Sequence, residues 1–133
     1  MGRKMWAGVA CATISLSNVP MNSALADGVR PILADLRPPP NATMEQVRLG
    51  DRVFHGEAAG GRCSVCHGVD AKGTANGNDL TLGMWIWSDG THASLKAIIH
   101  HNMRVAPGMD GDLTAEDVDA VAAYVWALGH QKP

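Results

Sequence analysis

The sequence predicts a small all-α domain with three to four helices joined by long loops. Three segments, 43–55, 91–102 and 114–129, carry apolar residues at helical spacing. Gly, Pro, Asn and Asp are concentrated between these segments, and no segment alternates polar and apolar residues as a half-buried strand would. With 133 residues, 46% of them hydrophobic, the chain has the size and composition of one folded domain.

Residues 1–26 have the features of an export signal. Arg3 and Lys4 precede an uncharged, mostly small and apolar stretch, and Ala24-Leu25-Ala26 fits the small-x-small pattern of a cleavage site. The apolar stretch is too short and too interrupted to span a bilayer, which takes about 20 residues. An uncleaved anchor and a lipoprotein signal cleaved before Cys11 are the alternatives. We expect an exported, periplasmic protein with no transmembrane anchor in its mature chain.

Charge argues against one class of partner. The formal net charge is −2, and it becomes −4 without the signal, which contains two basic residues and no acidic one. A protein held on DNA or RNA by a basic patch has the opposite balance. We therefore expect no nucleic-acid partner.

Residues 27–42 are predicted to form a proline-rich arm that precedes a compact domain at 43–133. Arg37-Pro38-Pro39-Pro40 favours polyproline II and excludes a helix. The first helix follows, because Thr43 and Gln46 fit a capping box, and Gly56 ends it.

The middle of the chain is expected to be mostly irregular. A loop opens at Gly60-Gly61 and continues through the cysteines, and Trp85-Ile86-Trp87 is a short turn or extended piece. The second helix ends near Asn102, since two turn signals, Pro107-Gly108 and Asp110-Gly111, exclude regular structure before the last helix.

The last helix has the clearest signals in the chain. Thr114 caps it with Asp117 three residues later, and Gly129 ends it. Its predicted buried stripe consists of Val118, Val121, Ala122, Val125 and Leu128.

Cys63-Ser64-Val65-Cys66-His67 is a C-x-x-C-H motif, which is typical of covalent haem attachment. Two thiols three positions apart can add to the two vinyl groups on one edge of a porphyrin, and the next residue places an imidazole under the iron. A thioredoxin-like pair would need a βαβ pattern, a disulfide would close a very small loop, and zinc would need two more ligands. The motif predicts one haem c bound through Cys63 and Cys66, with His67 as the proximal iron ligand and a carbonyl oxygen bonded to its second ring nitrogen.

From about Thr43 to Gly129 the chain resembles a small class I c-type cytochrome. Besides the cysteine motif, the matching residues are Gly50, Phe54, Gly68, Gly73, Leu80 and the helix from Leu113 to Trp126. The resemblance implies a cytochrome c fold in which the first and last helices cross, with Gly50 accepting Tyr124. It also implies an electron-transfer protein rather than an enzyme, similar to cytochromes that serve periplasmic dehydrogenases and haem-copper oxidases.

The chain departs from this family at the distal iron ligand. The family usually has a methionine directly followed by proline, and that position is Ala106 here. Met109 is the first candidate to replace it, Met103 the second and Met84 the third, although each could simply fill a gap in the core.

Two further outcomes stay open at the iron. His100 or His101 would give a bis-histidine haem, which tends to have a lower reduction potential than a His/Met haem. With no distal ligand, the site would be open and suited to a haem sensor or a peroxidase-like protein.

Trp85 and Trp87 are expected to pack against the haem, with their N–H groups available to a propionate, although plain core packing explains them equally well. An acidic run (Asp110, Asp112, Glu116, Asp117 and Asp119) either steers a positively charged partner or is a solvated helix start. The pattern assigns no role to His55, His92 or His130.

The function predicted from these observations is one-electron transfer between larger redox partners, a dehydrogenase on one side and a respiratory acceptor or oxidase on the other. The alternative is a fixed haem subunit of a dehydrogenase complex, with the proline-rich arm as its tether.

Overall fold

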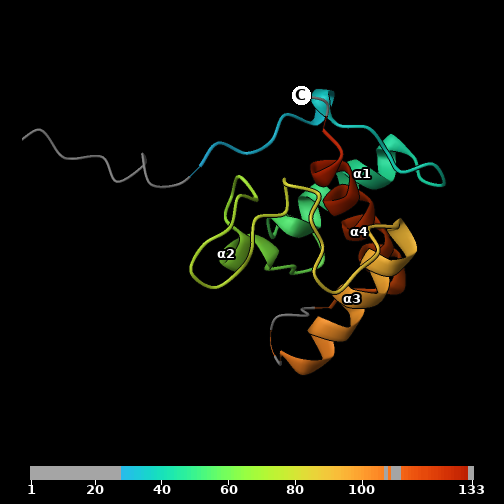
Figure 1. Ribbon diagram of the computed structural model, residues 1–133. Helices are drawn as coiled ribbons and strands as arrows, with labels where there is room; N and C mark the ends of the chain where they lie inside the picture. The colour runs from blue at the N-terminus through green and yellow to red at the C-terminus, as the bar shows by residue number, and fades with distance from the viewer. Residues whose placement is uncertain (1–27, 107, 109–111, 132–133) are drawn as a thin grey trace, which may run out of the picture.

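The computed structural model describes residues 28–106, 108 and 112–131. Its elements are the 3-10 helix η2 (Leu33–Asp35) and the α-helices α1 (Met44–Phe54), α2 (Cys63–His67), α3 (His92–Val105) and α4 (Ala115–Gly129) (Figure 1). Over these residues the regular structure is helical, with one isolated bridge between Thr74 and Gly77. The all-α prediction is confirmed. The predicted signal, residues 1–26, lies outside the described part of the chain.

Both predicted capping boxes are present. The Thr43 hydroxyl accepts a hydrogen bond from the Gln46 N–H at 3.2 Å, and the Gln46 side chain accepts one from the Thr43 N–H at 2.9 Å. At the start of α4, Thr114 and Asp117 exchange the equivalent bonds at 3.2 and 2.8 Å. Each box satisfies N–H groups that a helix start otherwise leaves unpaired.

The crossing of α1 and α4 depends on Gly50. A Cβ at this position would overlap the carbonyl of Ala120 and would lie 2.8 Å from the Cβ of Tyr124. The Tyr124 ring packs edge-on against Phe54 with ring centroids 5.4 Å apart. The close approach that the family resemblance implies between Gly50 and Tyr124 is therefore present, and it brings the two helices together beside α2.

The core is centred on α4, which is more buried than predicted. All five residues of the predicted stripe are buried, and so are Ala120, Ala123, Tyr124 and Ala127. The reason is that α1 and α3 both pack against α4, so more than one face of this helix is covered. In contrast, α3 has one fully buried residue, Leu95.

Two local predictions were wrong. The loop expected through the cysteines contains α2, whose five residues are too few to produce a periodic pattern; Gly68 ends it with a φ of 82°. In addition, α3 extends to Val105, three residues beyond the predicted end at Asn102, since no Gly or Pro intervenes before Pro107. No helix among the described residues is long and apolar enough to cross a membrane.

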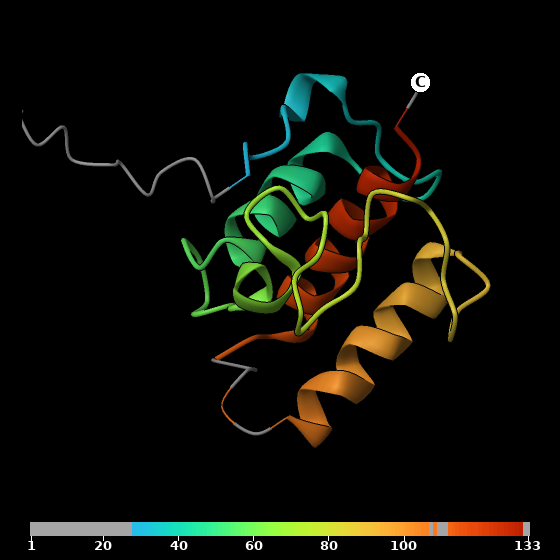
Figure 2. The same cartoon turned by 60° about the vertical axis from the view of Figure 1, so that its left-hand side comes forward.

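The described part of the proline-rich arm lies against α1 and α4 (Figure 2). Leu36 and Pro39 are buried. Arg30 donates hydrogen bonds to the carboxylates of Asp51 and Glu57. The arm is therefore attached to the domain both by buried apolar residues and by ion pairs.

Candidate functional site

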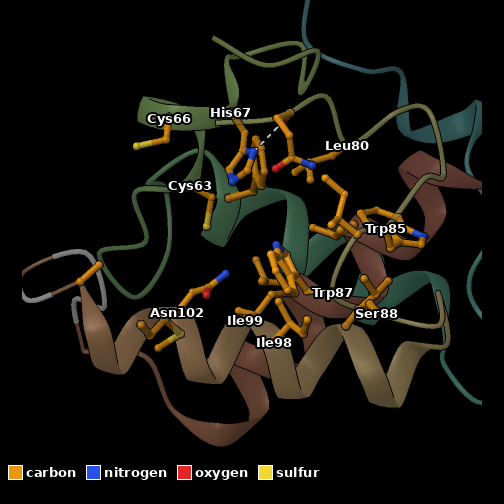
Figure 3. A pocket seen from close by; sticks show the side chains of 18 of the residues that line it. Cys63, Cys66, His67, Leu80, Trp85, Trp87, Ser88, Ile98, Ile99 and Asn102 are labelled. Carbon is orange, nitrogen blue, oxygen red and sulfur yellow. Dashed lines mark hydrogen bonds between the residues drawn. The ribbon is translucent and has the colours of Figure 1, made fainter. Parts of the chain in front are cut away.

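The site begins at α2, which holds both cysteines within one helical turn. Cys63 and Cys66 carry free thiols, and both border a cavity of about 440 Å³. Burial raises the pKa of the Cys63 thiol. In Figure 3, Cys63 and His67 point from α2 into the cavity, and α3 lies along the opposite side.

His67 is oriented by the loop that follows α2. Its Nδ1 lies 2.9 Å from the Asn78 carbonyl oxygen, and this bond is the dashed line in Figure 3. A carbonyl only accepts hydrogen bonds, so Nδ1 carries the hydrogen and the lone pair of Nε2 remains available to a metal. Gly77 permits this arrangement, because a Cβ there would lie 2.6 Å from the Cys66 carbonyl oxygen and 3.0 Å from Nδ1 of His67.

The cavity wall is mainly apolar and is built from five parts of the chain. Its volume lies within the range of small-molecule and cofactor sites, about 300–1,000 Å³. Beyond α2, the apolar lining residues are Phe54, Leu80, Trp85, Ile86, Trp87, Leu95, Ile98, Ile99, Met103, Ala106, Val121 and Val125. Such a wall limits the contact of water with the group that occupies the cavity, although Ile86 and Trp87 are themselves exposed.

Both predicted tryptophans border the cavity, in different settings. Trp85 is partly buried, and its Nε1 is buried with no hydrogen-bond partner among the described residues. Figure 3 shows this nitrogen directed away from Cys63 and His67. Trp87 is 84% exposed and lies between His67 and α3.

The distal candidates fall into separate places. Met103 and Ala106 line the cavity at the end of α3, and Met109 lies outside the described residues. Met84 is 67% exposed and does not border the cavity. His100 and His101 are exposed and do not line it either.

The structure adds residues that the sequence pattern did not single out. Asn102 lines the cavity and points into it from α3 (Figure 3). Asn78 binds His67 through its carbonyl, which any residue could supply, so no sequence signal could have found it. His55, the residue that directly follows α1, lies in a charged cluster with Asp51; the two are four positions apart, a spacing that brings side chains together at a helix.

Part of the acidic run serves local structure. Asp117 caps α4, and the Asp119 carboxylate accepts hydrogen bonds from Lys96 at 2.8 Å and from Gln46 at 3.0 Å. These two carboxylates are therefore engaged within the domain. Asp110 lies outside the described residues.

The residues present fit a covalently bound haem. Two thiols lie three positions apart on one turn, the next residue offers a free imidazole nitrogen, and the adjoining cavity is apolar and of suitable size. Haem c uses this donor set: thiols for the porphyrin edge and an imidazole for the iron.

Comparison with known proteins agrees with this interpretation. The Cytochrome c family matches residues 47–129. The chain is 32% identical over 90 residues to the Cbb3-type cytochrome c oxidase subunit CcoP of Azospirillum sp. (strain B510), with 53% of this chain and 30% of that protein covered.

Two other relatives are similar to the same extent. CcoP of Rubrivivax gelatinosus is 33% identical over 86 residues, and subunit FixP of Bradyrhizobium sp. (strain ORS 278) is 30% identical over 91 residues. Each alignment covers 63% of this chain, but only 26% and 31% of those proteins. The chain thus spans less than a third of the length of these curated relatives. No solved structure gives a significant match.

Proposed function

Because the chain belongs to the cytochrome c family and carries covalent haem c, we propose that it works as a monohaem electron carrier in the periplasm. The single observation that supports this best is the joint position of Cys63, Cys66 and His67 at one apolar cavity. When bound, haem c supplies one-electron chemistry at its iron. The protein residues hold this group, set its ligands and limit its contact with water.

Cys63 and Cys66 form the two thioether bonds in this proposal. Each thiol adds across one vinyl group: the sulfur bonds to one carbon and the hydrogen goes to the other, so nothing leaves and no oxidant is needed. The helical turn of α2 supports the assignment, because it places both thiols on one short segment beside the cavity.

His67 is the proximal iron ligand. Its bond to the Asn78 carbonyl fixes the ring orientation and keeps the hydrogen on Nδ1, which leaves Nε2 free to bind iron. The expectation that a carbonyl oxygen holds the second nitrogen is thus matched by Asn78.

The distal ligand is proposed to be Met109, with Met103 as the second candidate. The position of Met103 on the cavity wall supports the second assignment. The oxidised visible spectrum distinguishes the two, because a thioether bound to ferric haem gives a weak band in the red. Loss of this band in Met109→Ala but not in Met103→Ala supports Met109, and the reverse result supports Met103.

An open distal site is the rival function, since Ala106 stands where the family usually has methionine and lines the cavity. Carbon monoxide added to the reduced protein would then bind without displacing a protein ligand. Rapid saturation at low carbon monoxide, together with no thioether band, supports a sensor or peroxidase-like role. No binding under the same conditions supports a carrier.

The proposed partners are a dehydrogenase as donor and a haem-copper oxidase or other membrane complex as acceptor. The relatives are named as subunits of cbb3-type oxidases, which supports an acceptor of that kind. The test is oxidation of the reduced protein by membranes that contain such an oxidase. Fast oxidation by these membranes, but not by membranes of an oxidase deletion strain, is the expected result. Equal rates with both would contradict it. Fractionation of the producing cells tests export, with covalent haem expected in the periplasmic fraction.

A further inference from the structure

A charged cluster with two buried members lies next to Phe54, one of the residues that line the cavity. We define the His55 cluster as Arg30, Asp51, His55 and Glu57. It joins the proline-rich arm to α1 and to the residues just after it. The side chains of Asp51 and His55 are 3% and 6% exposed. Charged groups buried to this extent need partners, so the protonation state of each one matters.

The environment of His55 requires two hydrogens on its ring. Nδ1 lies 2.8 Å from the Asp51 carbonyl oxygen and 3.1 Å from the Asp51 carboxylate. Nε2 lies 2.9 Å from the Val69 carbonyl oxygen. Each of these oxygens accepts hydrogen bonds when the carboxylate is ionised, whereas a neutral imidazole donates only one. The imidazolium satisfies both nitrogens, and either neutral tautomer leaves a nitrogen lone pair facing an oxygen.

The surrounding charges favour this state. Burial alone lowers the pKa of His55, but hydrogen bonds to Asp51 and Val69 raise it overall. Burial likewise raises the pKa of Asp51, and hydrogen bonds from His55 and Arg30 outweigh it, so Asp51 stays ionised. The positive charge of Arg30, which belongs to the arm, lowers the pKa of His55. The negative charge of Glu57 favours the imidazolium.

The remaining group that faces His55 comes from α4. The Tyr124 ring centroid lies 6.2 Å from that of His55, and burial raises the pKa of the Tyr124 hydroxyl, which keeps it neutral. The formal charge of the His55 cluster is therefore zero with the imidazolium and −1 with the neutral ring.

A single aromatic ring separates this cluster from the proximal ligand. The Phe54 centroid is 5.0 Å from that of His55 and 6.5 Å from that of His67. The side chains of Phe54 and His55 are buried and that of His67 is partly buried, so charges at His55 are less screened than charges in water. A charge on His55 therefore acts on whatever His67 binds.

We propose that His55 is held as an imidazolium on the proximal side and raises the reduction potential of the haem. This inference rests on the function proposed above. The oxidised iron carries one more positive charge than the reduced iron, so a buried cation nearby disfavours the oxidised state. His55 is a positioning residue in this account, because it acts through the field and through its bond to the segment that follows His67.

Two variants of opposite charge change test the proposal on the haem-loaded protein. His55→Gln removes a positive charge and is expected to lower the midpoint potential. Glu57→Gln removes a negative charge of the cluster while the hydrogen bonds of His55 to Asp51 and Val69 stay, and it is expected to raise the potential. His130→Gln is the matched control, because His130 is exposed at the end of α4, and its potential is expected to equal that of the unmodified protein.

A second readout needs no variant. Nitrogen NMR of the reduced, haem-loaded protein at pH 7 is expected to show both His55 ring nitrogens carrying hydrogen. A neutral tautomer, or variants that shift the potential in the same direction, would overturn the proposal. If the unmodified protein holds no covalent haem, the function proposed above fails instead, and the nitrogen NMR result on the haem-free protein still decides the state of His55.

Discussion

The two sides of the cavity are held in different ways. On the proximal side, α1 and α4 pack directly against each other through Gly50, Phe54 and Tyr124, and the arm adds charged contacts. On the distal side, α3 has one fully buried residue, and its apolar face, with Ile98 and Ile99, borders the cavity. The comparison indicates that the proximal side is stabilised by contacts within the protein. The position of α3 depends more on the group that occupies the cavity.

The largest expected effect comes from removing both attachment points. Cys63→Ser combined with Cys66→Ser should abolish covalent haem and destabilise α3 more than the α1–α4 pair. Haem staining of a denaturing gel tests the first part, and hydrogen exchange resolved by helix tests the second. A stained band that survives denaturation would refute the attachment. Equal protection of α3 and α4 would refute the difference between the two sides.

A substitution at the helix crossing tests the proximal side directly. Gly50→Ala places a methyl group against the Ala120 carbonyl and should destabilise the fold by about 1–3 kcal/mol or more. Denaturant unfolding followed by circular dichroism measures this change. Arg48→Ala, at an exposed position of the same helix, is the control and should change stability by less than about 0.5 kcal/mol. Similar effects of the two substitutions would contradict the packing account.

A smaller effect is expected at the start of α4. Thr114→Ala removes the acceptor for the Asp117 N–H and should cost about 1 kcal/mol. Thr114→Ser keeps this hydrogen bond and should restore most of the loss, as thermal unfolding would show. If the serine variant is as unstable as the alanine variant, the cap is not the cause.

The smallest effect is a pH dependence from the His55 cluster. The pKa of His55 is raised, so its contribution to stability is complete below about pH 6.5 and is lost as the pH rises through its folded-state pKa. The pKa of Asp51 is lowered, so its contribution is complete above about pH 3.9 and is lost as the pH falls through its folded-state pKa. The free energy of unfolding, measured from pH 3 to 9, should fall less steeply above neutral pH in His55→Gln than in the unmodified protein. An unchanged alkaline slope would contradict this.

The proximal side was also the part that the sequence predicted well. Thr43 and Thr114 each act through a neighbour three residues later on the same helix, so their signals are local, whereas the pairing of Gly50 with Tyr124 followed from the family resemblance. On the distal side, the end of α3 was predicted less well. Pro107-Gly108 indicates a turn, but it does not determine at which residue the preceding helix ends. The His55 cluster escaped prediction since it joins residues 30, 51 and 55 with a carbonyl at Val69. A backbone acceptor leaves no trace in the sequence.

The most direct test of the central claim is a spectroelectrochemical titration of the exported protein. The account predicts one covalent haem that is oxidised and reduced reversibly, with the ratio of the two forms changing tenfold per 59 mV as expected for one electron. A protein with no visible redox transition, or one in which the haem leaves on denaturation, would contradict it.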